Sequence, residues 1–368
     1  MKSVMKGIQN HPGLELQLIL GGGVLLEKYG RVMDSTHAEG FKPDRMIPFL
    51  VEGETLVTMA KSAGIAVMEF STAFENLKPD VVIVIADRFE CLSMTMAASY
   101  MNIPVAHVEG GEVSGSIDES IRHAITKLSH LHFPASLDAA RRIERMGERK
   151  ETIFQVGATS LDVFEELDLN DLQPVIDAQH VSGLGPPQDL QPGNYLVIIQ
   201  HPVTTEYADN LDHINETIHA VHELGMPGVW IWPNMDAGSN AVSKGLRIYR
   251  EKYRPSHLVY FKSLNIELYA PLLKNACCIL GNSSSGLRES AYLGTPAVNI
   301  GTRQSGRERG LNVIDVGYDR QEIMAAVRQH MAHGRYPQDA VYGSGSSWKN
   351  IIDVLATFEF TTQKQITY

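Results

Sequence analysis

The sequence predicts an α/β protein made of two doubly wound parallel-sheet units in tandem. Short apolar runs alternate with longer helical patterns along the chain, which is typical of parallel strands joined by crossover helices. With 368 residues, the chain can form two domains, each with its own hydrophobic core. Glycine and proline gather in residues 167–194, which we interpret as a linker between a first domain over 1–166 and a second over 195–345.

The expected strands are short and apolar. Residues 1–10 instead predict an amphipathic helix, so the first domain does not open with a strand. The run VVIVI at 81–85 is apolar throughout, which indicates a strand buried on both faces. In the first domain we expect strands at 14–20, 81–85 and 104–108, with weaker ones near 130–134 and 152–156. In the second domain we expect them at 195–200, 228–232, 257–261, 276–280, 297–300 and 313–316.

Composition excludes several classes of protein. The 43 aspartates and glutamates outnumber the 32 lysines and arginines, and the net charge of −11 disfavours binding along nucleic acid. No apolar run approaches the roughly 18 residues of a membrane span, and the start lacks the apolar core of a signal peptide. The three cysteines and the scattered histidines form neither a disulfide framework nor a metal-binding pattern. We therefore expect a cytoplasmic protein with no metal site and no membrane or nucleic-acid partner.

The first candidate segment directly follows the strand expected at 81–85. Asp87 and Arg88 stand at the carboxyl end of that strand, where open α/β sheets bind their ligands. Neither charge can stay buried without a partner or a substrate. A local Asp–Arg pair that closes the turn into the next helix explains the same two residues, so both interpretations stay open.

The second candidate segment joins the strand at 104–108 to a helix that begins near residue 116 or 118. Glu109 ends the strand, and a glycine-rich loop follows it. Asp118 and Arg122 are four residues apart, so they share a helix face and can pair, although an N-cap role explains Asp118 as well. Carboxylates that converge at strand ends can separate their pKa values, so that one serves as acid and another as base. Asp87, Glu109 and Asp118 are therefore the candidate catalytic residues.

The third candidate segment is a serine and glycine loop in the second domain. An apolar strand ending at residue 280 runs into this loop and then into a helix, so amides, hydroxyls and the helix N-terminus can hold an anion. Glu289, one turn into the helix, can accept from a ribose hydroxyl. Simple capping explains the serines equally well, and a surface position explains the glutamate. The candidate binding residues of this loop are Ser283, Ser284, Ser285, Gly286 and Glu289.

Three more candidates follow other strands of the second domain. His201 can donate to a phosphate, whereas a lone histidine in a loop is more often a satisfied polar residue. Asn234 follows the strand expected at 228–232. Arg303 lies in a glycine and arginine loop that can hold an anion in bidentate fashion.

Taken together, these segments resemble the hydrolysing UDP-N-acetylglucosamine 2-epimerases of the sialic-acid pathway type, which include the epimerase half of the bifunctional animal enzyme. The motifs keep the family order from residue 1 to residue 347, and the EGGEVSGSID stretch is the most specific. The matching stretches are ADRFE, HVEGGEVSGSIDESIRHAITKL, QHPVTT, PNMDAGS, GNSSSGLRE and GTRQSGRE.

The resemblance implies a GT-B-like fold of two Rossmann-like domains with the active site between them. It also implies a C-terminal helix in 346–368 that returns to the first domain, a UDP-sugar substrate, no cofactor, and a homodimer or homotetramer. Family members open with a strand and a Gly-Thr-Arg loop, and this sequence begins after both. We therefore expect the first domain to lack its first strand.

The resemblance also assigns roles to residues. In this family the C2 proton is removed while UDP leaves C1 by anti elimination, and water then adds to the 2-acetamidoglucal to give N-acetylmannosamine. Asp87, Glu109 and Asp118 would be the acid and base groups, with the one that takes the C2 proton left open. Glu289 would hold the ribose. The diphosphate or sugar contacts would come from Arg88, Arg122, His201, Ser284, Ser285 and Arg303.

Three alternatives stay open. The same chemistry can act on a UDP-N,N'-diacetylbacillosamine of the legionaminic acid pathway. A GT-B glycosyltransferase shares the glutamate-bearing nucleotide loop but gives no reason for the ADRFE and EGGEVSGSID segments. The third alternative is a binder of UDP-sugars without catalytic activity.

Overall fold

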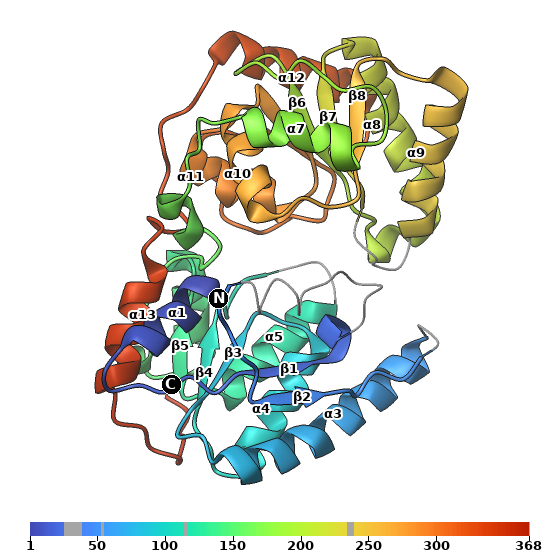
Figure 1. Cartoon of the computed structure of the whole chain (residues 1–368). Coiled ribbons are helices and arrows are strands. Elements are labelled where there is room, and N and C mark those ends of the chain that lie inside the picture. The colour runs from blue at the N-terminus through green and yellow to red at the C-terminus, as the bar shows by residue number, and fades with distance from the viewer. Residues whose placement is uncertain (26–38, 53–54, 114–116, 234–238, 368) are drawn as a thin grey trace. The chain divides into compact units, whose positions relative to one another are not determined.

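The computed structural model describes residues 1–25, 39–52, 55–113, 117–233 and 239–367, which fold into two compact units (Figure 1). The first unit comprises residues 1–112, 117–159 and 346–368, and the second comprises 113–116 and 160–345. The chain therefore passes from one unit to the other between residues 159 and 160, earlier than the boundary expected at residue 166.

The segment 167–194, which was expected to be a linker, is not a linker between the two units. Residues 167–194 lie inside the second unit, where they form helix α7 (Gln173–Ser182). Leu184 pairs with Tyr260 through two backbone hydrogen bonds of 2.8 and 2.9 Å. Val175 and Leu190 are buried. The glycines and prolines of this segment thus mark turns between packed pieces, because several of its apolar side chains are held in the core.

The first unit contains a three-stranded parallel sheet and a separate parallel pair of strands. The sheet has the order β3 (Val82–Ile85), β4 (Val105–Val108), β5 (Leu131–Phe133), and the pair is β1 (Ile19–Gly21) with β2 (Arg45–Ile47). The described helices and 3-10 turns of this unit are α1 (Lys2–Asn10), η1 (Gly22–Leu25), α3 (Leu56–Leu77), α4 (Phe89–Tyr100), α5 (Ile117–Leu128), α6 (Leu137–Arg145), η3 (Lys150–Thr152) and α13 (Ser347–Thr357).

Two strand expectations in this unit were wrong in part, and one strand was missed. The run at 14–20 is strand only from residue 19, and residues 14–18 are irregular. β2 was missed because it has only three residues, two of them exposed, and Pro48 directly follows it within the apolar stretch at 46–51. The stretch at 152–156 contributes only an isolated bridge between Ile153 and His132. The helix expected at 1–10 and the strands at 81–85, 104–108 and 130–134 are confirmed.

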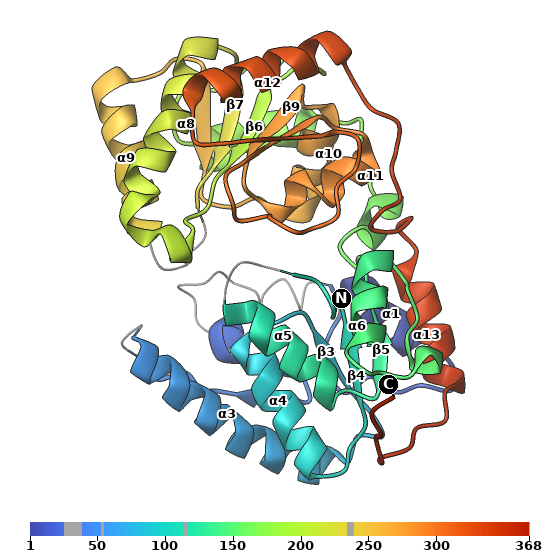
Figure 2. The same ribbon diagram turned by 180° about the vertical axis from the view of Figure 1, so that it is seen from behind.

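Both faces of the three-stranded sheet are covered by helices. Val82 and Val84 of β3 pack with α3 and α4 in one apolar cluster. Ile83 and Ile85 pack with α1 and α13 in another. Figures 1 and 2 show α3 and α4 on one side of the sheet and the adjacent helices α1 and α13 on the other. Burial of alternate residues on opposite faces explains why this strand is apolar at every position.

The second unit is built on a six-stranded parallel sheet, and all six strands expected from the sequence are confirmed. The strand order is β11 (Val313–Val316), β10 (Ala297–Ile300), β9 (Cys278–Gly281), β6 (Leu196–Ile199), β7 (Gly228–Ile231), β8 (Leu258–Phe261). Its other described helices and turns are η4 (Asp162–Glu166), η5 (Thr204–Asp209), α8 (Asn210–Leu224), α9 (Ser239–Tyr253), α10 (Ile266–Asn275), η6 (Ser284–Gly286), α11 (Glu289–Leu293) and α12 (Arg320–His333).

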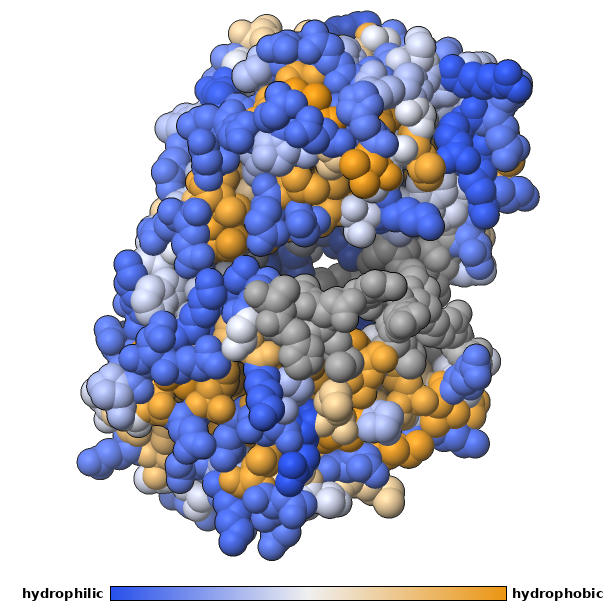
Figure 3. Space-filling view, in the orientation of Figure 1, coloured by the Kyte–Doolittle hydropathy of each residue, from blue (hydrophilic) through white to orange (hydrophobic). Residues whose placement is uncertain are grey.

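Helices cover this sheet on both faces as well. One large apolar cluster joins α8, α9 and α12 to the sheet around the fully buried Trp230. Figure 2 shows these three helices on one side, and Figure 1 shows α7 and α10 on the other. Most of the surface seen in Figure 3 is hydrophilic, in keeping with apolar side chains turned inward. Within the described ranges, no helix combines the length and the apolar character needed to cross a membrane.

Candidate active site

In the first unit, two acidic candidates meet at one edge of the sheet. Ile85 of β3 pairs with Val108 of β4, and the amide of Ala86 donates to the carbonyl of Val108 at 3.0 Å. Asp87 lies two residues beyond β3, and Glu109 directly follows β4. Parallel pairing therefore brings both carboxylates to the carboxyl edge of the sheet, where open α/β sheets bind ligands.

The backbone at these two strand ends is strained, and a buried histidine supports it at Ala86. Ala86 and Glu109 both adopt left-handed conformations, with φ of 60° and 59°. Such a conformation costs a non-glycine residue about 1 kcal/mol and is found preferentially at functional sites. Burial lowers the pKa of His107 to about 3, so its ring is neutral. Its Nε2–H donates to the carbonyl of Ala86 at 2.8 Å, and its Nδ1 accepts from the hydroxyl of Thr126 at 3.1 Å.

Arg122 pairs with Asp87. Its guanidinium is 3% exposed and donates both to the carboxylate of Asp87 and to the carbonyl of Glu112, the latter at 2.8 Å. The sequence suggested Asp118 as the partner of Arg122. Asp118 does lie in the first turn of α5, but its side chain is outside the described part of the structure. The buried guanidinium orients the carboxylate of Asp87.

Glu109 is held by a residue far along the chain. The side chain is 7% exposed, and its Oε1 accepts from the amide of Thr159 at 3.1 Å and from the hydroxyl of Thr159 at 3.0 Å. The loop that follows requires a glycine at Gly111, where φ is 78° and a Cβ atom would lie 2.5 Å from the carbonyl of Ala139. Packing therefore requires the second glycine of the EGGE stretch.

Arg88 is placed differently from the other candidates. Its side chain is 72% exposed and forms an ion pair with Glu90 at 3.1 Å. The local pair between Asp87 and Arg88 that the sequence allowed is therefore wrong: Arg88 pairs with Glu90, and Asp87 pairs with Arg122.

In the second unit, Asn282 links the loops after two neighbouring strands. Its buried side chain accepts from the amide of His201 at 2.7 Å and donates to the carbonyl of His201 at 2.9 Å. Its own carbonyl accepts from Arg303 at 3.2 Å and from Gln304 at 2.9 Å. Gly281, just before it, has φ of 130° and leaves only 2.0 Å between a Cβ atom and the carbonyl of Ile199, so glycine is required there. One asparagine thus brings two candidates, His201 and Arg303, to the same edge of this sheet.

The serine loop forms a 3-10 turn, η6, before a short helix. Ser283 accepts from the amide of Ser285 at 3.3 Å, which confirms the capping role. The hydroxyl of Tyr269 donates to Ser285 at 2.7 Å, which leaves the proton of the Ser285 hydroxyl available to a ligand. Helix α11 has only five residues, so it adds little helix dipole to this loop. A Cβ atom at Gly286 would meet nothing closer than 3.9 Å, so packing within the unit does not demand a glycine there.

Glu289 lies beside this turn with one oxygen in use. Its Oε1 accepts from the hydroxyl of Ser160 at 2.8 Å. Its Oε2 is buried and has no hydrogen-bond partner in the described part of the chain. A buried carboxylate oxygen without a donor is costly unless a ligand hydroxyl or water supplies one. Asn234, the remaining candidate, falls outside the described residues.

Three residues that hold these groups in place were not predicted from the sequence. His107 could have been noticed as a polar residue inside the apolar run PVAHV, and Asn282 as a polar residue directly after a buried strand. Thr159 carries no such signal, because 50 residues separate it from Glu109 and only tertiary folding joins them.

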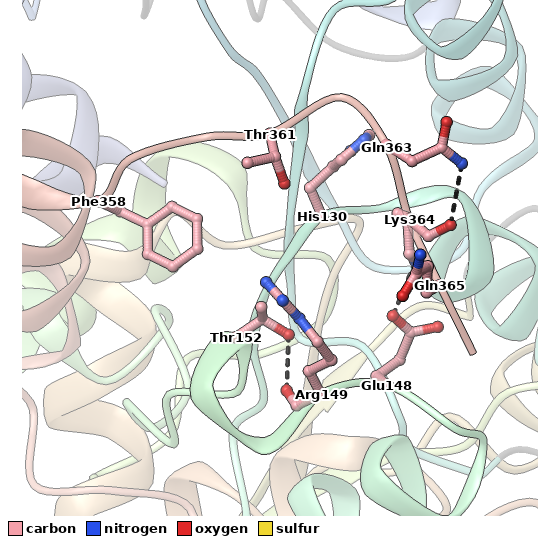
Figure 4. Close-up of a pocket in the computed structure, with 9 residues that line it drawn as sticks. All are labelled: His130, Glu148, Arg149, Thr152, Phe358, Thr361, Gln363, Lys364 and Gln365. Carbon is pink, nitrogen blue, oxygen red and sulfur yellow. Dashed lines mark hydrogen bonds and ion pairs between the residues drawn. The ribbon is translucent and has the colours of Figure 1, made fainter. Parts of the chain in front are cut away.

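A separate polar pocket of about 80 Å³ lies in the first unit between η3 and the C-terminal tail (Figure 4). Beside it, the buried carboxylate of Glu148 accepts from Lys127 at 2.5 Å, from Lys364 at 2.7 Å and from His132 at 3.2 Å. Lys364 also donates to the carbonyls of Lys127, at 2.7 Å, and of Ser129. This cluster attaches the tail to the unit and contains none of the candidate site residues.

The fold and these two strand-end clusters define a class. Two Rossmann-like units of parallel sheet, each with polar groups at the carboxyl edge, make this a GT-B-like protein. A solved structure with the same fold is the UDP-GlcNAc 2-epimerase from Neisseria meningitidis bound to UDP-GlcNAc. The two chains superpose with a TM-score of 0.75 and 18% identity, over 96% of this chain and 95% of the other.

The chain belongs to the UDP-N-acetylglucosamine 2-epimerase family, whose family model matches residues 6–356. It is similar to the UDP-N-acetylglucosamine 2-epimerase of Neisseria meningitidis serogroup B, with 31% identity over 99% of this chain and 94% of the relative. It is also similar to the hydrolysing UDP-N,N'-diacetylbacillosamine 2-epimerase of Legionella pneumophila, with 32% identity over 99% and 93%.

Proposed function

We propose that this protein is a hydrolysing 2-epimerase that converts UDP-GlcNAc and water into N-acetylmannosamine and UDP for the synthesis of sialic-acid-type sugars. The observation that carries this proposal is the pair of carboxylates, Asp87 and Glu109, at one sheet edge of a chain that matches epimerases over nearly its whole length. Both sit beside strained, buttressed backbone in the first unit.

The chemistry needs such groups because the C2–H bond of the sugar is only weakly acidic. In the proposed first step, a carboxylate takes the C2 proton, the C2–H electron pair becomes the C1=C2 double bond, and the C1–O bond breaks to release UDP. In the second step, water adds to this double bond. Its oxygen binds C1, and C2 receives a proton on the face opposite to the one from which the first proton was removed. Asp87, Glu109 and Asp118 supply and receive these protons as a coupled set.

The second unit would hold the nucleotide. Glu289 has a buried oxygen to which a ribose hydroxyl can donate, and the hydroxyl of Ser285 has a proton to offer a phosphate. We assign His201, Ser284 and Arg303 to the same ligand, because these residues lie at the carboxyl edge of the sheet. Arg122 then acts through Asp87, while the exposed Arg88 would meet the substrate by leaving Glu90.

The same machinery could act on a second substrate. The Legionella pneumophila relative is described as acting on UDP-N,N'-diacetylbacillosamine, and its identity to this chain matches that of the Neisseria meningitidis enzyme within one percentage point. Elimination and hydration involve only C1 and C2, so substituents at C4 and C6 leave the chemistry unchanged. The two candidate substrates therefore differ in how the sugar would be recognised and share the same reaction.

The decisive experiment is to incubate the purified protein with each donor in D2O and follow the products by NMR. Free UDP together with a free manno-configured sugar carrying deuterium at C2 is the expected result, and the faster donor identifies the substrate. Intact UDP-ManNAc would instead establish a non-hydrolysing epimerase. Binding of UDP by calorimetry without turnover of either donor would reject an enzymatic role. Light scattering on the same sample tests the homodimer or homotetramer.

Substitution of the carboxylates tests the site itself. Asp87→Asn, Glu109→Gln and Asp118→Asn should each lower kcat by about 100-fold or more, since a general acid or base contributes about that much. Asp87→Asn also leaves the buried guanidinium of Arg122 without its carboxylate, so circular dichroism verifies the fold of each variant. Asp80→Asn is the matched control, because Asp80 is an exposed aspartate just before the opposite end of β3. Wild-type turnover in all three carboxylate variants would refute the mechanism.

A further inference from the structure

Two consecutive residues hold the carboxylates of both clusters. Thr159 donates its amide and its hydroxyl to Oε1 of Glu109, at 3.1 and 3.0 Å. Ser160 donates its hydroxyl to Oε1 of Glu289 at 2.8 Å. Neither donor belongs to a motif that the sequence analysis selected.

These residues also mark the point at which the chain leaves the first unit. Thr159 is the last residue of its segment in the first unit, and Ser160 is the first of its segment in the second. Each hydrogen bond therefore lies within one unit: Thr159 with Glu109 in the first, and Ser160 with Glu289 in the second. The peptide bond between them is one of the places where the chain passes from the first unit to the second.

The backbone on either side is anchored, so these donors are held in place. Before the pair, the amide of Val156 donates to the carbonyl of Pro134 at 3.1 Å, and Ala158 is buried. Thr159 itself is only 6% exposed. After the pair, Leu161 is fully buried. A donor on a fixed backbone orients a carboxylate more strictly than one on a mobile loop.

We propose that Thr159 and Ser160 are positioning residues, with Thr159 orienting Glu109 for proton transfer and Ser160 orienting Glu289 for nucleotide binding. This assignment rests on the function proposed above. Thr159 fixes one oxygen of Glu109 with two donors, which sets the plane of the carboxylate and the direction of its other oxygen. Ser160 occupies one oxygen of Glu289 in the same way, and the buried Oε2 is left for the ligand.

The proposal predicts different kinetic effects for two adjacent substitutions. Thr159→Val keeps the shape and the amide donor but loses the hydroxyl, so kcat should fall by about tenfold to 100-fold with KM little changed. Ser160→Ala should raise KM, and the Kd for UDP, by roughly threefold to tenfold with kcat little changed. Thr159→Ser restores the hydroxyl and should restore kcat.

The experiment is steady-state UDP release by the full-length wild type and these variants, with calorimetry of UDP binding and circular dichroism to verify folding. If Thr159→Val does not fold, Thr159→Ala provides the same comparison without a bulkier side chain. Wild-type kcat in the threonine variant, or equal changes of kcat and KM in both variants, would overturn the assignment. Failure of the wild type to release UDP would reject the proposed function itself, which separates the two failures.

Discussion

Replacing Glu148 with glutamine should destabilise the first unit markedly. Glu148 is 4% exposed and accepts hydrogen bonds from Lys127, His132 and Lys364. Glu148→Gln keeps the size of the side chain but removes its charge, so two lysines lose the carboxylate that they share. Removing one partner of a buried ionic cluster leaves the other charges uncompensated, which is why such changes are costly.

The expected loss of unfolding free energy follows from the pKa of the Glu148 carboxylate. Burial alone would raise the pKa of Glu148, but the hydrogen bonds from His132, Lys127 and Lys364 outweigh burial and lower it from 4.5 to about 2. A lowering of this size corresponds to roughly 3 kcal/mol of unfolding free energy at neutral pH. We therefore expect Glu148→Gln to lower the unfolding free energy of the first unit by about 3 kcal/mol at pH 7.

The pKa of Glu148 also determines how its stabilisation of the first unit changes with pH. Because the pKa of Glu148 is lower in the folded protein, its stabilisation is complete above the unfolded value of 4.5 and is lost as the pH falls towards 2. The stability difference between wild type and Glu148→Gln should therefore be constant from about pH 5 to about pH 8 and should narrow at lower pH.

Urea unfolding followed by pulsed hydrogen exchange and mass spectrometry measures this effect for each unit separately. Peptides from β5 report on the first unit, and peptides from β6 in the second unit serve as an internal reference. Glu151→Gln is the matched control, because Glu151 is exposed and lies three residues further along the chain. A β5 transition of Glu148→Gln that coincides with that of Glu151→Gln at pH 7 would refute the reasoning.

Three further predictions concern the site loops. Gly111→Ala places a Cβ atom 2.5 Å from a backbone carbonyl at φ of 78° and should cost about 1 to 3 kcal/mol in urea unfolding of the first unit. Asn282→Ala removes hydrogen bonds of 2.7 and 2.9 Å to His201 and should cost the second unit about 2 kcal/mol while weakening UDP binding by calorimetry. Arg122→Gln leaves Asp87 without its buried partner and should lower the stability of the first unit by about 3 kcal/mol. An unfolding midpoint equal to wild type would contradict the prediction concerned.

The strands of the second unit were predictable because four are continuous apolar runs and the other two, β10 and β11, are interrupted by a single polar residue. β10 and β11 have the predicted bounds, and the other four differ by one or two residues at their ends. β2 was not predictable, because it is only three residues long and the proline that directly follows it is unfavourable in a strand. The role of 167–194 was mistaken because glycine and proline mark turns inside a packed unit as readily as they mark a linker.

The positions of the carboxylates at strand ends were likewise predictable, but the residues that pair with them were not. Asp87 and Glu109 each follow an apolar run, and that pattern alone places them at a sheet edge. Their partners were not deducible: Arg122 pairs with Asp87, 35 residues away, and Glu109 depends on Thr159. Helix spacing favoured Asp118 for Arg122, since only contacts close in sequence can be inferred from spacing.

The sequence by itself determined the alternation of strands and helices, the family, and the acidic and serine-rich segments at strand ends. These features depend on local patterns of hydrophobicity and on residue types at fixed spacing. Tertiary structure alone decided that Glu109 and Glu289 are held by adjacent residues, that Asn282 joins two loops, and that Lys364 attaches the tail through Glu148. Such contacts join residues far apart in the chain, and their partners are selected by packing, which no local pattern records.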